Sequence, residues 1–152
     1  MIVEIRKAVE TEIEILLSFE KGIIKTERPF DNSLKEGAIN YYDLIELIRS
    51  ERSEVLVAVV NNEIVGSGYA KILAAEPYQK YLEYAYLGFM YVKPSFRKQS
   101  INLKIINGLM NWAKSQNLTE VRLEVYDENT IAKNAYLKAG FKPNLLEMRL
   151  EI

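Results

Sequence analysis

The sequence contains neither cysteine nor histidine. Without cysteine, the chain has no disulfide, no thiolate ligand for zinc and no thiol nucleophile. Without histidine, it lacks the base of Ser-His and Cys-His nucleophilic sites and the commonest metal ligand in proteins. We therefore expect no bound metal, and any chemistry has to come from carboxylates, tyrosines, lysines and backbone groups.

Long apolar runs and an excess of basic residues are also missing. No stretch approaches the ~18 uninterrupted apolar residues of a membrane span, and the N-terminal MIVEIRKAV has no signal-peptide pattern. The formal net charge is -1, whereas proteins that coat nucleic acid are basic. We therefore expect a cytoplasmic protein that binds neither nucleic acid nor membrane.

The chain of 152 residues has the size of one ordinary domain, without repeats or linkers. We expect residues 1–152 to form one domain with a buried core. Its charges are unevenly distributed, because no Asp or Glu occurs between Glu83 and Glu120. Five cations fall in that interval: Lys93, Arg97, Lys98, Lys104 and Lys114. We expect this third of the chain to bind something anionic.

The expected order of elements favours a mixed α/β sheet. Alternation and short apolar runs predict strands at 2–8, 54–60, 63–73, 83–92, 121–128 and 145–152, with a hairpin turn at Asn61-Asn62. Helical spacing predicts helices from a capping box at Thr11–Glu14 through about Lys25, at 40–49, at 99–115 and from Asn129 to Gly140. Three successive strands without intervening helices argue against a doubly wound sheet.

The stretch FRKQSIN, Phe96 to Asn102, lies where a strand ending in VKP passes into a helix. The unpaired N–H groups and dipole of a helix start favour a phosphate by about 0.3 to 1 kcal/mol, and Arg97 and Lys98 add positive charge. The stretch contains no glycine. On its own, a solvated helix start with two surface cations is the more common interpretation.

A second motif is NTIAKNAYLKAGF, Asn129 to Phe141. On a helix, Tyr136 shares one face with Ala132, Ala135 and Ala139. The three small side chains allow this helix to approach a flat or extended neighbour closely. A core tyrosine is nevertheless the more common fate of an aromatic on such a face.

Taken together, VKPSFRKQSIN and the later LEVYDENTIAKNAYLKAGF closely resemble motifs of the GNAT superfamily of N-acetyltransferases. The second motif is the specific one, since five residues stand at the family spacing: Asn129, Ala132, Tyr136, Gly140 and Phe141. The resemblance covers essentially the whole chain. It implies an α/β fold of the α+β type, whose central mixed, mostly antiparallel sheet has six to seven strands, two of them splayed, and about four flanking helices.

The resemblance implies transfer of an acetyl group from acetyl-CoA to a primary amine of a small molecule, peptide or protein. In that family the pantetheine arm lies between the two splayed strands, which here implies contacts with Met90, Tyr91 and Val92. The helix of Asn129 and Tyr136 would flank the thioester. The pyrophosphate would lie on the loop and helix start formed by Arg97, Lys98, Gln99, Ser100, Ile101 and Asn102.

Amine attack on a thioester requires a proton to leave the ammonium, the carbonyl to be polarised and the thiolate to be protonated. Tyr136 matches the family position of the acid, and a phenol of ordinary pKa, about 10, can protonate an alkyl thiolate. Backbone N–H groups near Met90 would polarise the carbonyl. For the general base we favour Glu83; the alternatives are Tyr84, Tyr86, or an acid such as Asp127 that acts through water. Without cysteine, we expect direct transfer in a ternary complex.

The loop departs from the family pattern, which usually reads RxxGxG or RxxGxA, because Ser100 and Asn102 occupy the small-residue positions. Glycine lets the backbone approach phosphate oxygens at positive φ, so we expect weakened but retained binding. Two alternatives stay open. One is a GNAT-fold domain that binds acyl-CoA as a sensor without turnover. The other is an unrelated phosphate- or nucleotide-binding module in which Tyr136 is only a core residue.

The acceptor side is expected to use the first helices and the strand around Glu83. Five tyrosines lie between residues 78 and 91, and Tyr41 and Tyr42 fall on the predicted second helix. They could form an aromatic, partly acidic pocket for a cation, although phenols packed at the water boundary explain most of them equally well. Members of the family are often dimers, and the last predicted strand, LLEMRLEI, could pair as an edge with a second copy, giving a homodimer.

Overall fold

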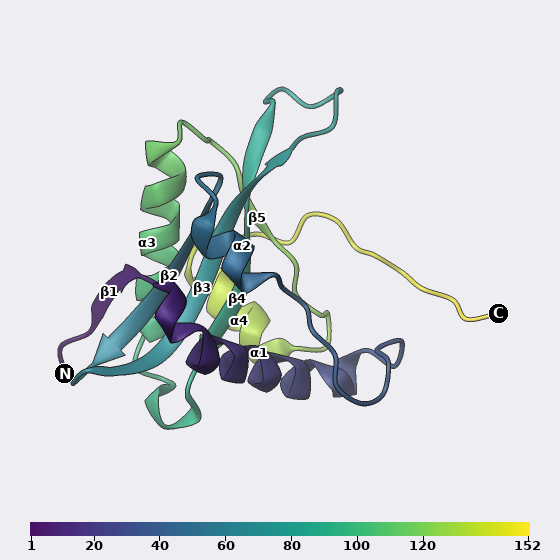
Figure 1. Cartoon of the computed structure of the whole chain (residues 1–152). Helices are drawn as coiled ribbons and strands as arrows, with labels where there is room; N and C mark the ends of the chain where they lie inside the picture. The colour runs from purple at the N-terminus through teal and green to yellow at the C-terminus, as the bar shows by residue number, and fades with distance from the viewer.

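The computed structural model describes residues 1–152, which build one five-stranded sheet in the order β1-β2-β3-β4-β5 (Figure 1). The first four strands are antiparallel to their neighbours, and β5 runs parallel to β4. The mixed sheet confirms the predicted fold class. The strands are β1 (Glu4–Lys7), β2 (Ser53–Val60), β3 (Glu63–Ala74), β4 (Glu83–Val92) and β5 (Val121–Leu123).

Four α-helices cover the two faces of the sheet: α1 (Ile13–Glu27), α2 (Leu44–Arg49), α3 (Ile101–Ser115) and α4 (Thr130–Lys138). Short 3-10 turns occupy Glu10–Glu12, Arg28–Phe30 and Pro94–Phe96. Helices α1 and α2 pack on one face around Phe19 and Leu44. Helix α3 packs on the other face through Ile105 and Leu109, and α4 adds Tyr136 to that cluster. None of the helices combines the length and apolar character that a membrane crossing requires.

The turn between β2 and β3 confirms the hairpin predicted from Asn61-Asn62. Val60 pairs with Glu63, so only two residues form the loop. Both asparagines have positive φ, 49° and 63°. Asparagine tolerates the left-handed region that a two-residue hairpin requires, which explains why this pair sits at the turn.

The starts of the first two helices differ from the prediction. The Val9 N–H donates to Glu12 Oε1 at 2.9 Å, so Glu12 closes the first turn and the box predicted at Thr11–Glu14 is wrong. Helix α2 begins only after Asp43, whose carboxylate accepts the Glu46 N–H at 3.2 Å. Tyr41 and Tyr42 therefore precede α2 rather than lying on it.

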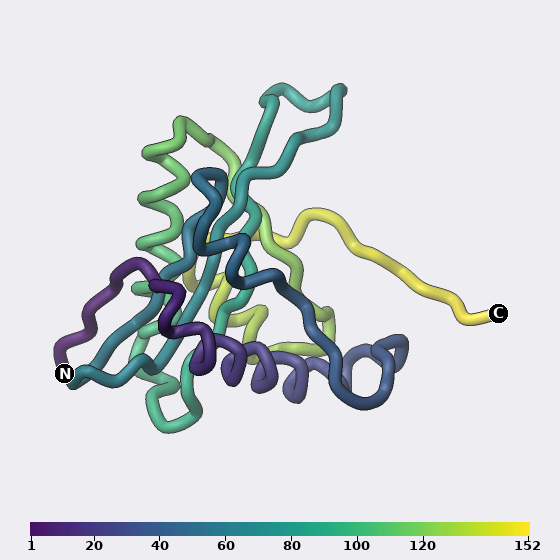
Figure 2. The backbone as a smooth tube through the Cα atoms, viewed as in Figure 1, coloured from purple at the N-terminus to yellow at the C-terminus, as the bar shows by residue number.

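The predicted C-terminal strand is wrong for the isolated chain, because residues 145–152 pair with no strand. They leave the body as an extended arm (Figure 2). Strand β5 is also shorter than the predicted 121–128. The sheet consequently has five strands instead of six to seven.

Candidate active site

Strands β4 and β5 separate after three paired residues. Strand β5 pairs with β4 only at Ala85–Leu87. Beyond Leu87, β4 continues to Val92, whereas the chain after Leu123 belongs to no strand. The residues Met90, Tyr91 and Val92 thus lie on a stretch of β4 that has no β5 partner. This open edge is the splay that the resemblance implied.

A β-bulge lies at the point where the strands separate. The pairing of β3 and β4 shifts between Ser67 and Tyr69, and Phe89 is fully buried with a φ of 57°. The Ser67 hydroxyl donates to the Phe89 carbonyl at 3.0 Å. A bulge turns backbone groups away from the ladder, so the amides of Phe89 and Met90 need not face β3. Such strain is commonly held at functional sites.

The loop before α3 adopts the backbone conformation of an anion site without glycine. Lys98 and Ser100 have φ values of 63° and 61°. Ser100 is the N-cap of α3, and its side chain caps no N–H group. The first amides of a helix have no partner within the helix, so those of Ile101 and Asn102 remain available to an acceptor. Alternation of ordinary and left-handed residues is typical of backbone nests that bind anions.

Arg97 packs along the open edge of β4. Its Nε donates to the Val92 carbonyl at 2.9 Å, and its guanidinium lies 5.7 Å from the centre of the Tyr91 ring. Lys98 and Gln99 are exposed beside it. Ile101 is only 1% exposed, so it can offer a ligand its backbone but not its side chain. The structure therefore brings the predicted loop residues next to the predicted strand residues.

Helix α4 has the caps that the sequence predicted. The Asn129 side chain accepts the Ala132 N–H at 3.2 Å, and Gly140 follows the helix with a φ of 101°. Tyr136 is partly buried and makes an edge-to-face contact with Phe141 at 6.0 Å. Burial raises the pKa of Tyr136 to about 12, and the charge of Glu27 adds to this shift. Tyr136 is consequently a weaker acid than the ordinary phenol assumed from the sequence.

A pocket of about 600 Å³ lies on the α1 and α2 face of the sheet. Lys71 contacts two of its rings, with its Nζ 5.7 Å from the centre of Tyr69 and 5.6 Å from that of Tyr86. The Tyr41 hydroxyl is buried and has no hydrogen-bond partner. We call this the tyrosine pocket; its lining is Tyr41, Tyr42, Asp43, Glu46, Leu47, Tyr69, Lys71, Leu73, Tyr84, Tyr86 and Glu124.

The tyrosine pocket is acidic and its phenols are neutral. Three carboxylates, of Asp43, Glu46 and Glu124, face a single lysine. Burial raises the pKa of Tyr69 to about 12, and the charge of Glu124 contributes. Burial also raises the pKa of Tyr86. A pocket with this lining suits a cation better than an anion.

Three of the seven tyrosines considered from the sequence do not line the tyrosine pocket. Tyr81 donates to Glu120 at 2.7 Å, and Tyr91 stacks on Phe19 at 4.8 Å. Tyr78 is 86% exposed. The remaining four, Tyr41, Tyr42, Tyr84 and Tyr86, line the tyrosine pocket.

Glu124 and Glu27 are site residues that the sequence reasoning missed. Glu124 could have been found by alternation, because Tyr86 pairs with Arg122 and the next residue on that face is Glu124. Glu27 ends α1, and burial raises the pKa of its carboxyl. No local pattern marks Glu27. Its charge raises the pKa values of tyrosines both in the pocket and on α4, namely Tyr41, Tyr42, Tyr86 and Tyr136.

Glu83 lies apart from these groups. It begins β4 at the end opposite the open edge, and its carboxylate forms an ion pair with Arg52. Glu83 does not line the tyrosine pocket, whereas its neighbour Tyr84 does. Asp127, another candidate from the sequence, pairs with Lys133 at 3.0 Å near the start of α4.

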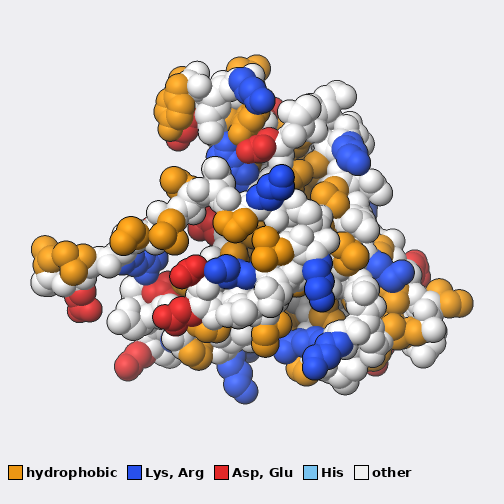
Figure 3. Space-filling model, turned by 180° about the vertical axis from the view of Figure 1, so that it is seen from behind, with side chains coloured by type: hydrophobic (Ala, Val, Ile, Leu, Met, Phe, Trp, Pro, Cys, Tyr) orange, Lys and Arg blue, Asp and Glu red, His pale blue; other side chains and the backbone are white.

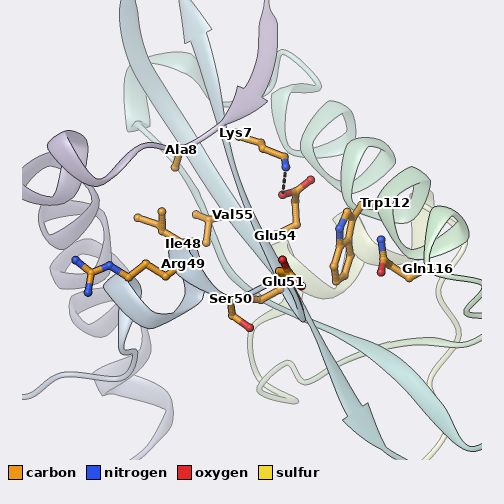
Figure 4. A pocket seen from close by; sticks show the side chains of 11 residues that line it. Lys7, Ala8, Ile48, Arg49, Ser50, Glu51, Glu54, Val55, Trp112 and Gln116 are labelled. Carbon is orange, nitrogen blue, oxygen red and sulfur yellow. Dashed lines mark ion pairs between the residues drawn. The ribbon is translucent and has the colours of Figure 1, made fainter.

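A second hollow, of about 330 Å³, lies where the end of β1 and the start of β2 meet α2 and α3 (Figure 4). Trp112 and Gln116 of α3 border it on one side, and Lys7 and Glu54 form an ion pair across it at 3.5 Å. It shares no lining residue with the tyrosine pocket. None of the site residues predicted from the sequence lines this hollow.

The open edge of β4 thus lies next to the start of α3 with its cationic loop, and the acidic tyrosine pocket lies on the α1 and α2 face of the same sheet. The model of the Acetyltransferase (GNAT) family matches residues 22–141. The chain belongs to the GNAT acetyltransferase family. No curated protein sequence matches the chain.

Solved structures share the fold over the full length. A mutant of the BH1408 protein from Bacillus halodurans has a TM-score of 0.89 and 20% identity, covering 100% of this chain and 99% of that chain. A predicted acetyltransferase from Clostridium acetobutylicum, solved with acetyl-CoA, has a TM-score of 0.76 and 21% identity, covering 99% and 96%. The aminoglycoside N-acetyltransferase AAC(6')-Iy, in complex with CoA, has a TM-score of 0.73 and 18% identity, covering 98% and 100%.

Proposed function

We propose that this protein transfers the acetyl group of acetyl-CoA to a primary amine by direct attack within a ternary complex. The observation that carries the proposal is the open edge of β4 beyond Leu87, bulged at Phe89. It is flanked by the uncapped start of α3 and by α4 with Tyr136. The fold is shared with structures solved with acetyl-CoA and with CoA.

The donor would bind mainly to backbone groups. Met90, Tyr91 and Val92 offer an unpaired strand edge to the pantetheine amides, as a strand adds to a sheet. The left-handed conformations of Lys98 and Ser100 shape the loop for a pyrophosphate. The full proposed set is Met90, Tyr91, Val92, Arg97, Lys98, Gln99, Ser100, Ile101, Asn102, Asn129 and Tyr136.

The acceptor would bind in the tyrosine pocket as an ammonium ion. Three carboxylates against one lysine favour a cation, and the neutral phenols provide ring faces for it. The relation to an aminoglycoside N-acetyltransferase supports an amine acceptor. A small molecule with more than one amino group fits this charge better than a neutral amine.

Tyr136 is proposed to protonate the departing thiolate. With a pKa of about 12 against about 8.5 for an ordinary thiol, this transfer is uphill by about 5 kcal/mol in water. Burial beside Tyr136 would also raise the pKa of the released thiol, so that the difference between the two pKa values becomes smaller. With a pKa of about 12, Tyr136 stays protonated at neutral pH.

For the general base, Glu27 fits better than the Glu83 favoured from the sequence. Burial raises the pKa of the Glu27 carboxyl, which makes its carboxylate a stronger base. Its charge reaches both Tyr86 in the pocket and Tyr136. Glu83 is held by Arg52 at the other end of β4. Glu27→Gln should therefore lower kcat strongly, whereas Glu83→Gln should leave it within about twofold of the parent.

The alternative function is a GNAT-fold sensor that binds acyl-CoA without turnover. Ser100 and Asn102 motivate this alternative, because they stand where the loops of family enzymes usually have glycine or another small residue. Calorimetry with acetyl-CoA, combined with CoA release across polyamines, amino sugars, aminoacyl compounds and peptide N-termini, separates the two. Turnover with any amine supports the enzyme. Tight donor binding with no turnover on the whole panel supports the sensor.

A further inference from the structure

The lysine of the tyrosine pocket is the one partly buried lysine of the chain without an ion pair. The partly buried lysines are Lys71, Lys93 and Lys133. The last two pair with carboxylates, at 2.8 Å and 3.0 Å. None of the ion pairs of the structure includes Lys71. Its amino group lies over two pocket rings instead, at the end of a flexible four-carbon stem.

These two rings lie at the start of the open edge of β4. Tyr86 pairs with Lys71 across β3 and β4. Tyr69 pairs with Gly88, the first residue of β4 after its last pair with β5. A Cβ on this glycine would lie 2.5 Å from Tyr69 Cζ, so the Tyr69 ring occupies the place of a side chain there. The amino group of Lys71 therefore lies beside a ring that rests on the open edge.

The pocket proposed to take an ammonium ion thus already contains one. Its three carboxylates and the faces of its neutral phenols, the features that suit a cationic acceptor, surround the Lys71 side chain. An ion pair holds an amine in its charged form and in one position, and Lys71 has none to break. A lysine amine that loses its proton is a nucleophile for carbonyl carbon. Lys71 consequently has the chemistry and the place of an acceptor.

We propose that Lys71 is a self-acetylation site, which takes the acetyl group of acetyl-CoA bound to the same chain when no other amine fills the pocket. This inference rests on the proposed function. The Lys71 Nζ forms a bond to the acetyl carbon, and the bond from that carbon to the CoA sulfur breaks. Of the two protons that the ammonium loses, one ends on the sulfur and the other passes to water. Acetylation removes the charge of Lys71 and leaves the three carboxylates of the pocket without an opposing lysine.

The test is incubation of the parent protein with acetyl-CoA in the absence of any amine. Peptide mass spectrometry should locate one acetyl group per chain on Lys71, and one CoA should be released per chain. The rate constant should not change with protein concentration, because donor and acceptor belong to one molecule. An unmodified Lys71, or a rate constant that rises in proportion to protein concentration, overturns the proposal. The parent alone decides this, so the result does not depend on whether a variant folds.

Two arginine variants separate self-acetylation from uncatalysed labelling of the surface. Figure 3 shows Lys and Arg side chains spread over the surface seen from behind, and acetyl-CoA would label such exposed lysines without catalysis. Lys71→Arg keeps the charge but should reduce CoA release to the level of a protein-free control. Lys7→Arg is the matched control, since Lys7 lines the other hollow and is exposed; it should release as much CoA as the parent. Equal release from all three proteins overturns the proposal.

The amine panel distinguishes failure of this inference from failure of the proposed function. A protein that acetylates an amine of the panel but leaves Lys71 unmodified keeps the proposed function and overturns the inference. A protein that does neither overturns both. Acetylation of Lys71 without turnover of any amine supports the inference and the sensor alternative together.

Discussion

Ser100→Gly tests whether the loop before α3 is strained by lacking glycine. Ser100 has a φ of 61°, which costs a serine about 1–2 kcal/mol relative to a right-handed conformation. Its hydroxyl caps no backbone group, so no hydrogen bond within the protein is lost. Glycine loses about 0.5–1 kcal/mol more on folding through its freer unfolded chain. The net expectation is a gain of about 0.5–1 kcal/mol in the free energy of unfolding.

Urea unfolding followed by circular dichroism measures this gain, which corresponds to a rise in Tm of about 1–4 °C. Gln99→Gly is the matched control, because Gln99 does not have positive φ and its replacement should stabilise nothing. Calorimetry with acetyl-CoA on the same proteins should give unchanged or tighter binding for Ser100→Gly. Destabilisation by Ser100→Gly would refute the strain argument. A large loss of affinity would show that the hydroxyl is itself a ligand of the donor.

Three further predictions concern named contacts. Tyr136→Phe should lower kcat by roughly 10²-fold with little change in acetyl-CoA affinity, as expected for loss of a general acid. Tyr136 must be protonated to act as the acid, and its pKa is about 12. Deprotonation of Tyr136 should therefore not lower kcat/KM of the parent between pH 8 and 10. A fall of kcat/KM near pH 10 would indicate a phenol of ordinary pKa. Glu20→Met should lower the free energy of unfolding by about 2–4 kcal/mol and raise the amine KM, because the buried Glu20 accepts the N–H groups of Tyr41 and Tyr42. Glu20→Gln keeps an acceptor oxygen and should lower the free energy of unfolding less. Asn129→Ala should lower the free energy of unfolding by about 1 kcal/mol because it removes the cap of α4, whereas Asn129→Asp should keep the cap and the stability of the parent. Equal unfolding curves for the parent and both variants would refute the role of this cap.

The sequence correctly predicted turns and helix caps that depend only on neighbouring residues. The Asn61-Asn62 turn and the caps Asn129 and Gly140 follow from backbone preferences, and all were found where expected. The start of α2 was misplaced because apolar spacing continues through Tyr41 and Tyr42, whereas Asp43 closes the first turn. A helix cap is a single hydrogen bond, and periodicity does not report it.

The site was less predictable where it depends on packing between distant segments. Glu27 looks like any exposed carboxylate at the end of an amphipathic helix, and only its burial beside the pocket tyrosines distinguishes it. The arm shows the opposite case. Its alternation predicted a strand, but residues 145–152 pair with no strand, because alternation does not specify a partner.

Two strained backbone positions would allow the proposed donor site to form without the family glycines. Phe89 and Ser100 both have left-handed backbones; Phe89 is itself buried, and Ser100 precedes a buried residue. The carbonyl of Phe89 is held by Ser67 and its ring is 1% exposed, while Ser100 is followed by Ile101, also 1% exposed. Core packing therefore imposes conformations that glycine would adopt at lower cost. Because the groups that the proposed donor site would offer are backbone amides, their orientation would matter more than the side chain attached. A serine is therefore expected to be tolerated at position 100 where a bulky β-branched residue would not be.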